Sequence, residues 1–99
     1  MEELINSVEK WAWKRGLTNP DFSNKQMLKV MEEVGETASA LAKGNKTALA
    51  DGIGDVAVTL IILAMQNDLT LEECLRGAYN EIKDRTGQTI NGVFIKDGH

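Results

Sequence analysis

Three glutamates, Glu32, Glu33 and Glu36, stand close together in an apolar segment that has a helical pattern. At about 100° per residue, their carboxylates fall within an arc of roughly 100° on one face of a helix. Carboxylates at this spacing repel one another, and only Lys29 is close enough in sequence to offset them. A divalent cation would relieve the repulsion, and hard oxygen ligands suit Mg²⁺ or Mn²⁺. The alternative interpretation is a solvated acidic stripe.

Asp51 and Asp55 form a second acidic element, four residues apart and therefore on one helix face. The segment that follows, residues 56–65, is apolar except for Thr59. A helix that is apolar on every side is expected to be buried on every side, and a carboxylate at its mouth needs a paired charge or a metal ion. Because a short turn at residues 43–45 joins the two acidic helices, we expect them to pack antiparallel with their clusters facing each other.

Composition limits the classes of protein to be considered. Ninety-nine residues predict a single domain over 1–99, and a net charge of −4 argues against a nucleic-acid partner. The one cysteine, Cys74, is predicted to be a buried structural thiol in a reducing cytoplasm. The one histidine, His99, excludes His-based catalysis and zinc motifs. The acidic N-terminus is unlike a signal peptide, and segment 56–65 has about half the length of a membrane span, so no membrane partner is expected.

The hydrophobic periodicity predicts an all-α chain of four helices that form a bundle. They are expected at about 2–14, from 23 or 24 to just before Gly44, from 45 or 46 to 66, and from 70 to 85 or 86. Gly16 and Pro20 end the first helix, and a Thr70-x-x-Glu73 capping box opens the last. The tail, residues 88–99, alternates apolar side chains around Asn91-Gly92 and is either a short hairpin or an extended arm.

The third helix needs more apolar cover than three other helices and a tail provide, because a chain of this size buries only about 60–65% of its unfolded surface. We therefore expect a homodimer or a homotetramer, with this helix near the interface. Gly35, Gly52 and Gly54 each cost about 1 kcal/mol in a helix relative to alanine. They predict close helix approach beside the acidic clusters; the alternative is a kink at 52–54.

The acidic helix and the apolar helix after it resemble the MazG-like all-α nucleoside triphosphate pyrophosphohydrolases, over most of the chain from Trp11 to about Lys96. Segments 25–36, 55–60, 79–85 and 91–94 carry the resemblance, which is to the short phage and bacterial members. It implies cleavage of a nucleoside triphosphate between its α and β phosphates. It also implies a role for two groups of residues: Glu32, Glu33, Glu36 and Asp55 as catalytic ligands of Mg²⁺, and Asn80, Lys83 and Arg85 as contacts to phosphate or sugar.

The chain departs from the family pattern at Gly52, where the second family motif, Glu-x-x-Asp, has its glutamate. Asp51 is the candidate replacement ligand, although it lies about 100° around the helix from Gly52. If a ligand is missing, Gly52→Glu should restore it and tighten Mg²⁺ or Mn²⁺ binding. If another helix passes too close to Gly52 for a side chain, the same substitution should destabilise the protein.

Three functions follow from these patterns. A Mg²⁺-dependent nucleotide pyrophosphohydrolase is the prediction; a non-catalytic nucleotide or metal sensor and a structural helical interaction module are the alternatives. Trp11 fits the core stripe of the first helix, and Trp13 fits a surface position. Gln26 either reaches a base or ligand, or lies on the surface. Lys83 and Arg85 have an alternative role as a solvated last turn that complements the helix dipole, and Asn80 an alternative as an ordinary exposed polar residue.

Overall fold

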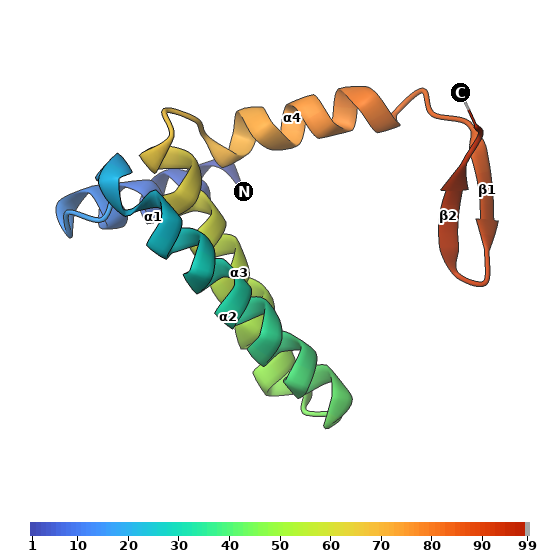
Figure 1. The fold of residues 1–99 in the computed structure, drawn as a ribbon, viewed down its shortest axis with the longest axis horizontal. Helices are drawn as coiled ribbons and strands as arrows, with labels where there is room; N and C mark the ends of the chain where they lie inside the picture. The colour runs from blue at the N-terminus through green and yellow to red at the C-terminus, as the bar shows by residue number, and fades with distance from the viewer. Residues whose placement is uncertain (99) are drawn as a thin grey trace.

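The computed structural model describes residues 1–98 and contains four α-helices, a 3₁₀ turn and a two-stranded hairpin (Figure 1). The elements are α1 (Glu2–Lys14), η1 (Pro20–Phe22), α2 (Ser23–Ala42), α3 (Lys46–Gln66), α4 (Leu71–Ile82), β1 (Gly87–Ile90) and β2 (Val93–Lys96). The predicted all-α class is confirmed, with the small hairpin added at the C-terminal end. His99 lies outside the described residues.

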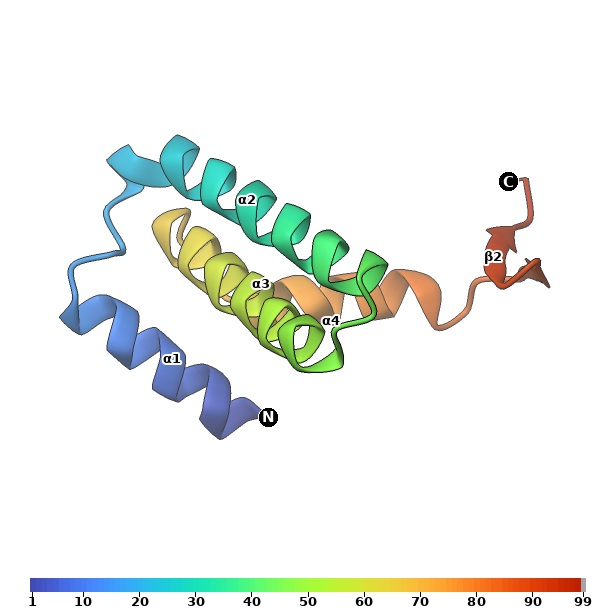
Figure 2. The same cartoon turned by 90° about the horizontal axis from the view of Figure 1, so that it is seen from below.

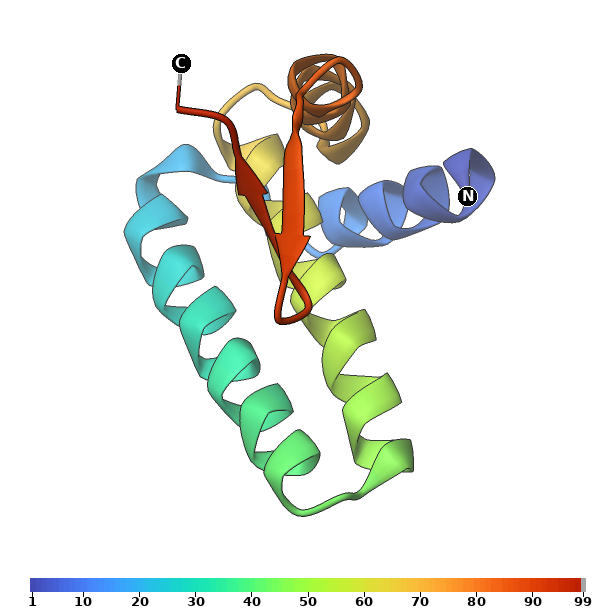
Figure 3. The ribbon, with the colours of Figure 1, turned by 90° about the vertical axis from the view of Figure 1, so that its right-hand side faces the viewer.

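Helices α2 and α3 form a long antiparallel pair that is the framework of the molecule (Figure 3). The turn between them is determined locally. Gly44 has a φ of 68°, and the Asn45 backbone N–H donates to the Ala40 carbonyl at 3.0 Å. The Asn45 side-chain oxygen then accepts from the Ala48 N–H at 3.0 Å and caps the start of α3. The expected antiparallel packing is therefore confirmed.

Two side-chain hydrogen bonds fix the register of this pair. The Gln26 amide nitrogen donates to the Thr59 carbonyl at 3.0 Å, and the Asn67 amide nitrogen donates to the Ser23 hydroxyl at 2.8 Å. In an antiparallel pair, each step toward the C-terminus of α2 is a step toward the N-terminus of α3. The register therefore places the glutamate cluster of α2 opposite the aspartates of α3.

Helix α1 packs on α3 away from α2, so α3 lies between the two (Figure 2). The segment after α1 is held to the end of α3 by the Gln66 amide nitrogen, which donates to the Leu17 carbonyl at 3.0 Å. The apolar core of the single chain is small and consists of Ala12, Val30, Ala40, Ile61, Ile62 and Ala64. Trp11, which was expected in this core, is 46% exposed because α1 has only α3 to pack against.

Helix α4 and the hairpin extend away from the three-helix body (Figure 1). The Thr70–Glu73 capping box is confirmed, but α4 ends at Ile82 rather than at the predicted Arg85 or Thr86. The hairpin alternative is correct for the tail, since Asn91 and Gly92 adopt the positive φ values of a two-residue turn. Cys74 is exposed, contrary to its prediction as a buried thiol, because α4 makes few contacts with the body.

Much of the apolar surface of α3 is only partly covered within one chain. The whole helix, Lys46–Gln66, has the length and hydropathy of a membrane span, although the segment 56–65 alone does not. This is weak evidence for a membrane, because the core helix of a soluble protein has the same properties. Only 28% of its most apolar 18-residue window is buried, so the expected burial on every side is not achieved by this chain alone.

Candidate functional site

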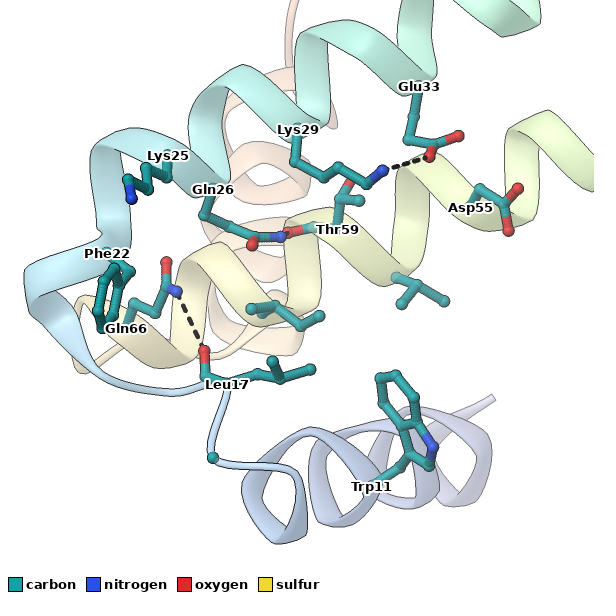
Figure 4. A pocket seen from close by; sticks show the side chains of 13 residues that line it. Trp11, Leu17, Phe22, Lys25, Gln26, Lys29, Glu33, Asp55, Thr59 and Gln66 are labelled. Atoms are coloured by element: carbon teal, nitrogen blue, oxygen red, sulfur yellow. Dashed lines mark hydrogen bonds and ion pairs between the residues drawn. The ribbon is translucent and has the colours of Figure 1, made fainter.

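A cavity of about 680 Å³ lies between α1, η1, α2 and α3, in the size range of small-molecule sites (Figure 4). We call it the charged cavity. It is lined by Trp11, Gly16, Leu17, Phe22, Lys25, Gln26, Lys29, Glu33, Asp55, Val58, Thr59, Ile62 and Gln66. Its wall combines apolar side chains with two lysines and two carboxylates, so it suits a ligand that has an apolar part and a charged part.

Glu33 and Asp55 are the two carboxylates of the charged cavity, and they come from facing helices (Figure 4). Glu33 is 9% exposed, and its carboxylate forms an ion pair with the Lys29 ammonium at 3.5 Å. The expectation that the acidic helices bring their clusters face to face is met for these two residues. The pair follows from the register of α2 against α3 and not from any local pattern.

The other predicted metal ligands lie elsewhere. Glu32 is exposed and pairs with Lys29 at 3.4 Å, and Glu36 is exposed on the next turn of α2. Asp51 lines a second depression, of about 780 Å³, between α1, α3 and the start of α4, which we call the apolar groove. Within residues 1–98, the chain nowhere gathers three acidic, histidine or cysteine side chains in a metal-binding arrangement.

Two carboxylates on the wall of one cavity nevertheless fit one kind of metal site. Mg²⁺ is commonly held by one or two carboxylates together with substrate phosphates and water, rather than by a cage made only of protein atoms. Glu33 and Asp55 provide such a pair on the wall of a cavity large enough for a nucleotide. The donor set therefore fits Mg²⁺ that arrives with a phosphate ligand, and it does not fit a preformed cluster of five carboxylates.

Repulsion among the carboxylates of the α2 cluster is offset only in part by Lys29. The negative charge of Glu33 raises the pKa of Glu36 above its usual value of 4.5, and Glu32 adds a smaller effect in the same direction. Glu32, followed by Glu33, raises the pKa of Lys29, which is the one basic side chain paired with the cluster among residues 1–98. The Lys29 ammonium thus forms ion pairs with two of the three glutamates, and Glu36 has no ion-pair partner in the described chain.

Glu36→Gln is expected to stabilise the protein at pH 7 when metal is chelated. A raised carboxylate pKa means that the folded state binds the proton more tightly than the unfolded state. The ionised Glu36 carboxylate therefore lowers the stability of the wild type at neutral pH, and this cost disappears as the pH falls through that pKa. Melting temperatures at pH 7 and pH 4 check this: the advantage of the variant should be present at pH 7 and lost at pH 4. An equal difference at both pH values would contradict it, and Glu3→Gln on α1 is the matched control.

Gly52 is buried against α2, where Thr37 passes very close. A Cβ atom at position 52 would lie 3.1 Å from the Thr37 Cβ and 3.2 Å from its Cα, and closer still to its hydroxyl oxygen. The second of the two sequence interpretations is thus the correct one: helix approach, and not only a lost ligand, accounts for this glycine. Gly35 and Gly54 were expected at similar contacts but have no such neighbour within 4 Å in the described structure.

The predicted phosphate contacts are remote from the charged cavity. Asn80 lies in the last turns of α4, and Lys83 and Arg85 follow it on the way to the hairpin (Figure 1). Arg85 lines a small depression with Glu81, Asp84, Thr86, Lys96 and Asp97 instead. Within one chain these residues do not meet Glu33 and Asp55.

Sequence reasoning missed several residues that line the charged cavity, among them Phe22 and Gln66. Phe22 sits in η1, a turn that the periodicity did not predict, and Gln66 is the last residue of α3. The sequence held a usable signal for Gln66, because a glutamine ends a segment that is apolar except for Thr59. In the structure its side chain is only 5% exposed. Gln26, left open between a ligand contact and a surface role, does line the cavity.

Comparisons with known proteins place this site within a family. The family model of the MazG nucleotide pyrophosphohydrolase domain matches residues 22–89, which include α2, α3, α4 and most of the first strand. An uncharacterized 18.2 kDa protein in the rep-hol intergenic region of Haemophilus phage HP1 is 41% identical over 69 residues, 70% of this chain and 42% of the relative. The chain thus spans about two fifths of that relative's length. No solved structure matched. Since the family model covers more than half of the chain, including both carboxylates of the cavity, the chain belongs to the MazG nucleotide pyrophosphohydrolase family.

Proposed function

We propose that this protein is a Mg²⁺-dependent pyrophosphohydrolase that converts a nucleoside triphosphate into a nucleoside monophosphate and pyrophosphate. The observation that carries the proposal is the placement of Glu33 and Asp55 on the wall of one nucleotide-sized cavity within a MazG domain. Mn²⁺ has the same preference for oxygen ligands and is the expected substitute. A cytoplasmic location, without nucleic-acid or membrane partners, belongs to the same proposal.

The residues of the cavity can divide the work of phosphoryl transfer. This chemistry needs charge neutralisation and positioning more than a protein nucleophile. Lys29 provides a cation at the cavity wall for phosphate oxygens. Glu33 and Asp55 would hold Mg²⁺, which when bound neutralises phosphate charge and lowers the pKa of a water molecule. A carboxylate oxygen of Glu33 or Asp55 that is free of the metal can accept the proton of the attacking water.

We propose an orientation of the substrate that follows the two ends of the cavity. Glu33, Asp55 and Lys29 gather at one end, and Phe22, Leu17 and Gln66 lie toward the other (Figure 4). We place the triphosphate at the first end and the base at the second. Phe22 is half exposed and offers a ring on which a base can stack.

We propose that the site is completed by a second copy of the chain. The radius of gyration, 15.9 Å, exceeds the roughly 13 Å typical of a compact chain of this length. Apolar side chains remain exposed on every helix, and the apolar groove follows the open side of α3. Since Asn80, Lys83 and Arg85 cannot reach the carboxylates of their own chain, a second copy is the source that would bring them to the charged cavity.

The protein is therefore expected to sediment as a dimer or tetramer at tens of micromolar, with the exposed face of α3 buried between copies. Sedimentation equilibrium checks this, and a monomer at that concentration would contradict it. A charge placed on the open face, in Ile53→Glu, should shift the equilibrium toward monomer, since Ile53 is 59% exposed within one chain.

Mixing two variants tests whether the second copy contributes to the site. Glu33→Gln and Arg85→Ala should each be inactive alone, whereas mixed oligomers contain some sites with both residues intact. Activity that returns on mixing supports shared sites. A mixture that exchanges subunits but stays inactive would show that Arg85 does not act across the interface.

The function itself is tested by pyrophosphate release from a panel of nucleoside and deoxynucleoside triphosphates with Mg²⁺, Mn²⁺ or a chelator. The proposal expects metal-dependent turnover of at least one nucleotide. Tight metal-dependent nucleotide binding without turnover would indicate the sensor alternative. The absence of both metal and nucleotide binding by calorimetry would indicate the structural module.

A further inference from the structure

The Gln66 side chain holds an unused hydrogen-bond acceptor at the charged cavity. Gln66 is 5% exposed and lines the cavity wall at the end of α3. Its amide nitrogen donates to the Leu17 carbonyl at 3.0 Å. Its amide oxygen is buried and has no hydrogen-bond partner among residues 1–98. Buried polar atoms in folded proteins are nearly always satisfied, so an orphan acceptor at a cavity indicates a missing donor.

The orientation of this amide follows from its one partner. A backbone carbonyl can only accept, so the NH₂ group of Gln66 must face Leu17 (Figure 4). Turning the amide over would place two oxygen atoms against each other and lose the bond. The Gln66 oxygen is therefore fixed on the side away from Leu17, and this side chain can offer a ligand an acceptor but not a donor.

The position of Gln66 matches the end of the cavity assigned to the base. Gln66 and Asp55 are eleven residues apart on α3, which corresponds to roughly 16 Å along the helix axis. A ligand that reaches both must be extended, with its charged end at Asp55. The oxygen is covered by neighbouring side chains, so a base reaches it by displacing one of them. Lys25 lines the cavity and is exposed, so its side chain can turn into solvent while the Phe22 ring stays in place.

We propose that the Gln66 amide oxygen accepts a hydrogen bond from the exocyclic amino group of the substrate's base, so that the protein selects cytosine and adenine over uracil and hypoxanthine. This inference rests on the proposed function. Uracil and hypoxanthine carry a carbonyl oxygen where cytosine and adenine carry the amino group. That carbonyl would face the Gln66 oxygen, leaving a buried acceptor unpaired and adding repulsion.

Nucleoside monophosphates test the inference without metal or turnover. Calorimetry should show that CMP binds about tenfold or more tightly than UMP, and AMP more tightly than IMP by a similar factor. Each pair differs at the exocyclic group that would meet Gln66 and at the proton on the neighbouring ring nitrogen, and is otherwise identical. Equal affinity within both pairs would overturn the inference, as would the absence of binding by all four nucleotides at millimolar concentration.

Two substitutions separate the acceptor from the contact to Leu17. Gln66→Met keeps the length of the side chain but removes both polar atoms, so the CMP:UMP affinity ratio should fall to about one through loss of CMP binding. Gln66→Glu also loses the bond to Leu17 but keeps an acceptor, so it should retain the preference. If both variants lose the preference equally, the role of Gln66 is to hold Leu17, and the inference is wrong.

Gln26→Met is the matched control: Gln26 lines the same cavity and also donates its amide nitrogen to a backbone carbonyl, that of Thr59, but among residues 1–98 its amide oxygen is not a buried acceptor without a partner. It should leave the CMP:UMP ratio unchanged even if it weakens both affinities. Failure of this inference is distinguishable from failure of the proposed function. Metal-dependent hydrolysis without base preference overturns only the role of Gln66. Base preference without hydrolysis overturns only the proposed pyrophosphohydrolase activity.

Discussion

Glu33→Gln is expected to lower the rate of pyrophosphate release on the order of 100-fold or more, with little effect on folding. The substitution keeps the size of the side chain but removes the charge that would hold Mg²⁺ at the cavity, and a positioned electrostatic group is commonly worth about 10²–10³ in rate. Glu33 is mostly buried, but its one ion pair is to the exposed Lys29, so the fold should tolerate the change. Asp55→Asn, on the facing helix, should have the same effect.

The measurement is turnover together with melting temperature, each with and without Mg²⁺ and nucleotide. In the wild type, Mg²⁺ with nucleotide should raise the melting temperature, because a ligand that binds only the folded state stabilises it. Both variants should lose that rise while melting normally without metal. Glu3→Gln, on the exposed side of α1, is the charge-matched control and should behave as wild type. Full activity in either cavity variant would show that its carboxylate is not part of the site.

Gly52→Glu is expected to destabilise the protein by about 1–3 kcal/mol, the usual cost of overpacking, and to lose metal-dependent stabilisation with it. Helix propensity favours the change by no more than about 1 kcal/mol, so the clash with Thr37 decides whether the substitution stabilises or destabilises the protein. This reverses the expectation that a glutamate here would simply restore a missing ligand. Denaturant unfolding measures the effect, and a well-folded variant with tighter Mg²⁺ binding would contradict the helix contact.

Two alanine variants make a matched pair for the same contact. Gly52→Ala should destabilise, whereas Gly54→Ala, two residues along the same helix with open space around it, should stabilise by up to about 1 kcal/mol. Thr37→Ala removes the hydroxyl that stands nearest to position 52, so it should recover part of the loss in a Gly52→Ala background. Additive effects in that double-mutant cycle would place the strain elsewhere.

The helices could be predicted from the sequence because their ends are determined locally. Asn45 and Thr70 cap helices with their own side chains, and Gly16 and Gly44 end helices at positive φ. These signals act within a few residues and need no knowledge of the rest of the fold. Helix α4 was overextended by prediction because no glycine or proline marks its end at Ile82, and the first such residue is Gly87.

The site could be predicted only in part, because it depends on register and on surfaces that one helix does not encode. The short turn between the two acidic helices predicted that they pack antiparallel, and the register of that pair then puts Glu33 and Asp55 on one cavity wall. The separation of Asp51 from Glu33 did not follow, since it depends on the rotation of α3 against α2. The exposure of Cys74 could not be anticipated either, because an amphipathic pattern shows that a face should be covered but not which chain covers it.

The most direct test of the central claim is to identify the products formed from a nucleoside triphosphate by ³¹P nuclear magnetic resonance in the presence of Mg²⁺. The account predicts equal amounts of nucleoside monophosphate and pyrophosphate, no reaction in a chelator, and loss of both products in Glu33→Gln. Release of inorganic phosphate with a nucleoside diphosphate, or no reaction with any triphosphate under conditions in which nucleotide binds, would contradict it.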